Sequence, residues 1–169
     1  MTASPDRTTG FHSDAIPIGE IGVARDSGVL RTFVGSCVAV VLQDRRRRVA
    51  ALAHVMLPAA NGRVTPPGKY ADTAVPEMLR LLSLLAGDSV ACTAMLAGGA
   101  RMFAFGAGSP IGDQNVTALE RALALVGIPI TARDCGGACG RRVSLDVATG
   151  SVTTEMVGRG IQALEEDRR

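Results

Sequence analysis

Residues 35–58, GSCVAVVLQDRRRRVAALAHVMLP, form the most informative stretch of the chain. Two β-prone apolar runs, 38–43 and 49–57, flank an aspartate and four consecutive arginines, a pattern typical of a β-hairpin with a solvated tip. Cys37 comes just before the first run, and the second run contains His54, one of the two histidines of the chain. In such a hairpin the side chains of Cys37 and His54 lie near the same end. They could be a catalytic nucleophile with its base, or two ordinary core residues.

The size and composition of the chain predict a single globular domain. The 169 residues are enough to bury a core without disulfides or a metal. Because 47% of the residues are hydrophobic but only 3% are aromatic, the core must consist of small aliphatic side chains. A net charge of +2, with one tyrosine and four phenylalanines, offers neither a broad basic surface nor many stacking platforms, so we do not expect a nucleic-acid ligand.

The sequence also predicts the compartment. No run approaches the roughly 20 apolar residues that a membrane span needs, and the N-terminal segment MTASPDRTTGFHSD lacks the apolar core of a signal peptide. We therefore expect a cytoplasmic protein without membrane insertion. Its cysteines should stay reduced and available for chemistry; they are Cys37, Cys92, Cys135 and Cys139.

Periodicity predicts an α+β fold in which a mixed, largely antiparallel sheet system is flanked by two main helices. Residues 16–34 indicate two strands joined by a turn at Asp26-Ser27-Gly28, and 89–100 indicate a buried strand. The segments IPITARD, RRVSLDV and SVTTEMV predict three more strands. Leucines at helical spacing predict helices in ADTAVPEMLRLLSLLAG and IGDQNVTALERALALVG, with Asp72 or Thr73 capping the first and Asp113 the second.

Domain boundaries follow from the same patterns. Residues 1–15 are small and polar and are expected to be a disordered lead-in. The domain should occupy residues 16–157, and residues 158–169 should form a polar C-terminal tail.

The residues around Cys37 suit a nucleophile. Gly35 and Ser36 permit a sharp turn that would expose the thiol and leave backbone N–H groups free to bind an oxyanion. A neighbouring imidazolium from His54 could lower the thiol pKa. The alternatives are an inert core cysteine beside a structural histidine, and a zinc site of Cys135, Cys139 and His54, which would lack the usual paired knuckles. Cys92, inside an apolar run, is expected to serve packing only.

Six segments in order carry a family resemblance. The runs GSCVAVVLQD, AHVMLP, GKYADTAVPEML, AGGARMF, IGDQNV and GGACGRRVSLDVATGSV resemble the CheD family, the chemoreceptor glutamine deamidases, over most of residues 16–157. The resemblance implies a cytoplasmic cysteine hydrolase that converts glutamine side chains of methyl-accepting chemoreceptors to glutamate, with some members also hydrolysing methyl esters. It implies an α/β sandwich similar to deamidating cysteine-hydrolase toxins, no metal or organic cofactor, and, in several bacteria, binding to the phosphatase CheC.

The resemblance also implies roles for single residues. The nucleophile falls on Cys37 and the general base on His54. The third catalytic residue, a threonine, falls on Thr32, with Arg31 as the alternative because RTFVGSC is one residue shorter than in some relatives. The segment 135–139 departs from the family, where threonine and polar residues are common around the double glycine.

A second class of function remains open at this stage. The same fold could be a binding module that sequesters a CheC-type phosphatase with minor or no catalysis. The presence of both Cys37 and His54 favours the deamidase, because a pure binding protein does not need the pair.

Overall fold

The computed structural model describes residues 15–63, 65–102 and 107–166. Its elements form two sheets and two α-helices, which confirms the predicted α+β sandwich. Most of the predicted lead-in, residues 1–14, lies outside the described residues. The similarity to deamidating toxins stays a prediction.

The larger sheet has the strand order β1-β4-β3-β5-β6. Its neighbours are antiparallel except for β5 and β6, which are parallel and are connected through α2. The strand bounds are Ile21–Arg25 (β1), Val38–Asp44 (β3), Val49–Val55 (β4), Thr93–Gly98 (β5) and Ile130–Cys135 (β6).

The smaller sheet, β2-β7-β8-β9, is fully antiparallel. Its strands are Val29–Val34 (β2), Arg141–Asp146 (β7), Ser151–Met156 (β8) and Gly160–Ala163 (β9). The last of these falls in the segment assigned from sequence to a polar tail. Glycines at positive φ on both sides of Arg159 turn the chain back, so that β9 pairs with β8 and the sheet continues beyond residue 157.

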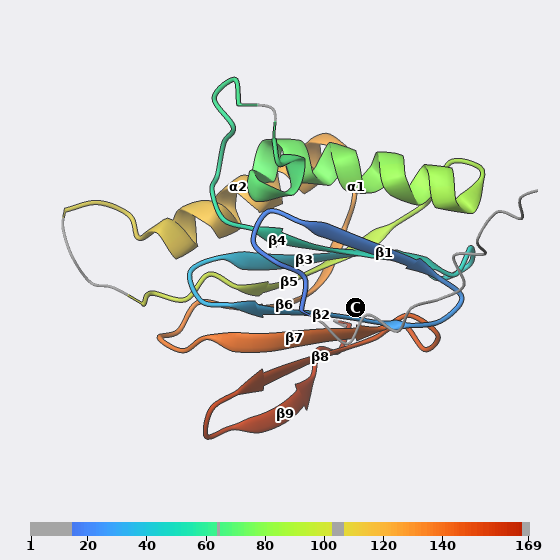
Figure 1. The fold of residues 1–169 in the computed structure, drawn as a ribbon. Helices are drawn as coiled ribbons and strands as arrows, with labels where there is room; N and C mark the ends of the chain where they lie inside the picture. The colour runs from blue at the N-terminus through green and yellow to red at the C-terminus, as the bar shows by residue number, and fades with distance from the viewer. Residues whose placement is uncertain (1–14, 64, 103–106, 167–169) are drawn as a thin grey trace, which may run out of the picture.

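The molecule has three layers (Figure 1). The helices α1 (Ala71–Ala86) and α2 (Ile111–Leu125) cover one face of the larger sheet, and the smaller sheet covers the other. All seven residues of β3 and of β4 are buried, because both strands are central and covered on both faces. Alternate side chains of these strands therefore enter two different cores, one under the helices and one between the sheets.

The two strands predicted on either side of Asp26-Ser27-Gly28 are present as β1 and β2, and they lie in different sheets, because β1 pairs with β4 and β2 with β7. The two predicted helix caps differ from the structure. Helix α1 begins after Tyr70 without a side-chain cap, because the Asp72 carboxylate instead accepts a hydrogen bond from the backbone N–H of Ala60. Helix α2 begins after Pro110, also without a side-chain cap, and Asp113 forms an ion pair with Arg101.

The end of β5 makes a very close backbone approach to β3. Gly98 has φ +118°, and a Cβ at this position would meet the carbonyl oxygen of Cys37 and lie 2.9 Å from Cγ2 of Val34. Only glycine fits this geometry, so the cysteine segment packs directly on the backbone of its neighbour.

We expect Gly98→Ala to lower the free energy of unfolding by about 3 kcal/mol, from backbone strain together with the clash. Gly127→Ala is the matched control, because Gly127 also has positive φ (+71°) but nothing lies near its would-be Cβ. The free energy of unfolding of Gly127→Ala should fall by only about 1 kcal/mol. Denaturant unfolding followed by circular dichroism measures both, and equal losses would contradict the close approach.

Candidate active site

The pairing of β3 with β4 places Cys37 and His54 on the same face of the larger sheet. Ala39 is the cross-strand partner of His54, and partners across an antiparallel pair point to the same side. Cys37, two residues before Ala39, packs with it against the core between the sheets. The two residues are thus diagonal neighbours at the end of the hairpin, a relation that spans about 7–8 Å or less.

The smaller sheet supplies a partner for His54 from across the core. Thr32 is fully buried on β2, and its hydroxyl oxygen lies 2.7 Å from Nδ1 of His54. The same hydroxyl donates its one proton to the carbonyl oxygen of Ile16, at 2.8 Å. It must therefore accept from His54, which places the imidazole proton on Nδ1 and a lone pair on Nε2.

The Nε2 atom of His54 is the free end of this chain of hydrogen bonds. The imidazole is only 5% exposed, and Nε2 is buried without a hydrogen-bond partner in the described part of the chain. A buried acceptor that is left free costs free energy unless the site uses it. On the Cys37 side of the sheet, such an atom can act as a proton acceptor.

Backbone and side-chain donors hold the segment Gly35–Cys37 by its carbonyls. The N–H of Ala100 donates to Gly35 and the N–H of Gly99 donates to Cys37, both at 2.8 Å. The side chain of Asn115 donates to the carbonyl of Ser36 at 3.2 Å. Every carbonyl of the segment is thus engaged.

Burial sets the charge state of the two side chains. Cys37 is half-buried, and desolvation raises its thiol pKa, an effect that its own backbone N–H partly offsets. Desolvation also lowers the pKa of His54, against a smaller opposing effect of the Ile16 carbonyl. Both shifts favour a neutral thiol beside a neutral imidazole. The resting thiolate–imidazolium pair expected from the sequence is therefore disfavoured by this environment.

The other residues singled out from the sequence are arranged differently. The side chain of Arg31 is exposed, on the face of β2 opposite to Thr32. Cys135 packs against the core under the helices, and Cys139 is exposed in the turn before β7. No three His, Cys, Asp or Glu side chains form a metal-binding group within the described ranges. Cys92 is buried in the core under the helices.

Two groups at the site had no role in the sequence analysis. One is the carbonyl of Ile16, which a residue type cannot reveal. The other is Asn115, which lies on the buried stripe of α2 with Gly112, Leu119 and Leu123. Asn115 follows Gly112 by three residues and precedes Leu119 by four, so helical periodicity places this polar side chain on the buried face of the helix. A polar residue at such a position is the signal that could have identified it.

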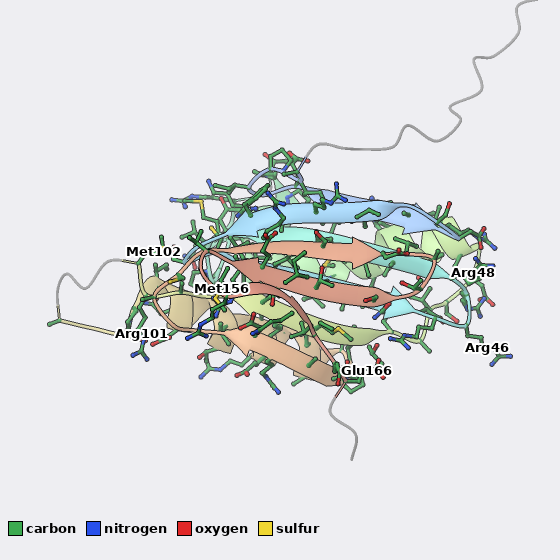
Figure 2. All side chains as sticks on the ribbon, turned by 90° about the horizontal axis from the view of Figure 1, so that it is seen from below. Arg46, Arg48, Arg101, Met102, Met156 and Glu166 are labelled. Atoms are coloured by element: carbon green, nitrogen blue, oxygen red, sulfur yellow. The ribbon has the colours of Figure 1, made fainter. Side chains whose placement is uncertain are left out.

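The opposite end of the hairpin also carries a surface hollow. It has a volume of about 780 Å³ and includes Asp44, Arg45, Arg47 and Glu166 in its lining. Figure 2 places Arg46 and Arg48 at this end of the molecule and Met102, which packs near Gly35, at the other. Arg45 pairs with Glu166 and Arg47 with Asp44. These ion pairs suit a structural role.

Comparison with known proteins gives a consistent result. Residues 56–156 match the CheD family, described as CheD chemotactic sensory transduction. The chain is 42% identical over 148 residues to "Chemoreceptor glutamine deamidase CheD" of Thermotoga maritima, which covers 87% of this chain and 94% of that protein. It is 42% identical over 139 residues to "Probable chemoreceptor glutamine deamidase CheD" of Methanococcus maripaludis strain C6, covering 81% and 90%. None of the helices within the described residues is long and apolar enough to cross a membrane.

The neutral state of His54 gives a pH dependence of stability with a definite sign. The folded-state pKa is lowered by burial, so near and below the ordinary value of about 6.5 the unfolded chain binds more protons than the folded one. The free energy of unfolding should therefore fall as the pH drops from 7.5 to 5.5. It should fall less in His54→Gln, as measured by urea unfolding. A wild-type protein that gains stability relative to His54→Gln on acidification would indicate a thiolate–imidazolium pair instead.

Proposed function

Because the chain belongs to the CheD family, we propose that it is a chemoreceptor glutamine deamidase, a hydrolase that converts glutamine side chains of chemoreceptors to glutamate. The observation that carries the proposal is the Thr32–His54 contact, which leaves Nε2 free on the face of the sheet that also carries Cys37. The reaction takes place in the cytoplasm, where the thiol stays reduced.

Cys37 is the nucleophile in this proposal, and His54 is its base. As the sulfur attacks the glutamine side-chain carbonyl, the thiol proton moves to Nε2 of His54. Thr32 accepts a hydrogen bond from Nδ1 and donates one to the Ile16 carbonyl, so the imidazolium that forms is stabilised at its far nitrogen. Backbone N–H groups of the turn formed by Gly35 and Ser36 stabilise the oxyanion.

The remaining steps return the site to its starting state. The imidazolium gives its proton to the leaving nitrogen as the C–N bond breaks, which releases ammonia and leaves a thioester on Cys37. His54 then removes a proton from water, whose oxygen attacks the thioester carbonyl. The C–S bond breaks, glutamate leaves, and the proton returns to the sulfur. Every proton moves between groups that this chain, the substrate and the attacking water supply, and the proposed reaction uses no metal or organic cofactor.

The position of the site limits the substrate. Cys37 lies at the end of a hairpin and is half-buried, so a glutamine must project from a receptor helix to reach the sulfur. Hydrolysis of receptor methyl esters would use the same thioester. Binding of a CheC-type phosphatase stays a prediction from the family.

Cys37→Ala should abolish the conversion of amide to acid while the fold is kept. The matched control is Cys139→Ala, which removes an exposed thiol in the turn before β7. Peptide mass spectrometry of chemoreceptor cytoplasmic fragments, incubated with each protein, measures the conversion. Deamidation by the folded Cys37→Ala protein would refute the proposal, and its loss in both variants would show that the assay does not report on Cys37.

Thr32→Ala should lower kcat at least about tenfold with little change in KM, because the lost interaction stabilises the imidazolium formed during reaction. Thr32→Ser keeps the hydroxyl and should retain much of the activity. Arg31→Ala is the neighbouring control and should be fully active, because that side chain is exposed on the other face of β2. If Arg31→Ala lost turnover while Thr32→Ala stayed fully active, the third catalytic residue would be Arg31 and not Thr32.

A further inference from the structure

Asn115 is a fully buried amide on the apolar stripe of α2. The same stripe carries Leu119 and Leu123, which pack in the core under the helices. An aliphatic side chain would be the ordinary occupant of such a position. The presence of an amide therefore requires an explanation from its contacts.

The amide nitrogen of Asn115 ties together the two segments that carry the nucleophile and the base. Its Nδ2 donates to the carbonyl of Ser36 at 3.2 Å and to the carbonyl of Met56 at 2.9 Å. Ser36 directly precedes Cys37, and Met56 lies two residues after His54. One side-chain NH₂ group thus uses both of its protons to fix one segment relative to the other.

The oxygen of the same amide indicates that the residue is not optimised for stability. Oδ1 of Asn115 is buried and has no hydrogen-bond partner among the described residues. A buried acceptor without a partner is unfavourable, so a side chain chosen only for packing would not carry it. The Nδ2 contacts are the compensating feature.

The first turn of α2 supports the same segment through the backbone. A Cβ on Gly112 would lie 2.5 Å from the carbonyl oxygen of Gly99, so the helix start packs directly on the 99–100 backbone. The N–H groups of Gly99 and Ala100 in turn hold the carbonyls of Cys37 and Gly35. Helix α2 therefore contacts the nucleophile segment twice, once through Asn115 and once through this backbone.

We propose that Asn115 is a positioning residue for the deamidation reaction, which sets the distance and orientation of Cys37 relative to His54 by clamping Ser36 to Met56. The inference rests on the proposed function. Because Asn115 is buried and acts through the two segments, its loss should affect the chemical step and leave substrate binding unchanged.

Asn115→Leu tests the clamp, because leucine keeps the branching at Cγ but removes both donors. We expect kcat to fall about 10²-fold, with KM within about twofold, and the thermal midpoint to fall moderately because two carbonyls lose their donor. The rate of Cys37 alkylation by iodoacetamide, followed by peptide mass mapping, should fall as well. Asn115→Ala is a second variant that removes the donors without filling the space.

Leu119→Ala is the matched control on the same buried stripe. It should lower the thermal midpoint by opening a cavity but keep the wild-type kcat below that midpoint. A folded Asn115→Leu or Asn115→Ala protein with wild-type kcat and alkylation rate would overturn the inference, as would an equal loss of kcat in Leu119→Ala. If wild-type protein deamidates no receptor fragment, the proposed function fails, while the alkylation rates still report whether Asn115 positions Cys37.

Discussion

The pairing of Ala39 with His54 is the constraint on which the site depends. Side chains of a strand alternate between two faces, so this register turns His54 and Cys37 together toward the smaller sheet. A slip of one residue would turn His54 toward the helices and away from Thr32. Both strands are buried on both faces, and the volume and shape of two cores therefore hold the register.

The hairpin could be predicted from the sequence because its information is local. Two apolar runs around a charged turn predict the pairing and place Cys37 and His54 near one end, while the register stays open by a residue or two. The partner of His54 depends on a contact between sheets, which periodicity does not encode. The turn at Asp26-Ser27-Gly28 resembles a hairpin turn, yet the chain crosses there from one sheet to the other, and this crossing brings Thr32 over His54.

The choice between Arg31 and Thr32 arises because RTFVGSC is one residue shorter than in some relatives, and the burial pattern of β2 separates the two residues. Leu30, Thr32 and Val34 are buried, so β2 alternates regularly. Phe33 interrupts this alternation in the sequence, because an aromatic residue suggests a core position. In the structure Phe33 is 54% exposed and lies 4.9 Å below the guanidinium of Arg142, which stabilises it on the outer face.

Long-range contacts also explain the helix caps and Asn115. The acidic residues near the start of both helices suggest caps by local rules, but Asp72 bonds to the Ala60 backbone and Asp113 pairs with Arg101. In Asn115 the amide contacts segments 59 and 79 residues away in sequence. The helical spacing identifies the position as buried, but only the fold shows what the amide binds.

The two ends of the hairpin differ in how fully their polar groups are satisfied. At the arginine end, the buried carboxylate of Asp44 accepts hydrogen bonds from the N–H groups of Arg47 and Ala91 and pairs with the Arg47 side chain. In the described part of the chain, the buried side-chain polar atoms without a partner all lie at the cysteine end; they are Nε2 of His54, Oδ1 of Asn115 and Nε of Arg141. Arg141 belongs to this end because it is paired with Val34 and bonds to Gly136.

This uneven distribution is informative because unsatisfied buried groups oppose folding. The well-paired arginine end and the two apolar cores must offset their cost. Selection for stability alone would replace such groups with aliphatic side chains or give them partners. Their concentration at this end of the hairpin, together with the close approach at Gly98, supports the proposed reaction at Cys37.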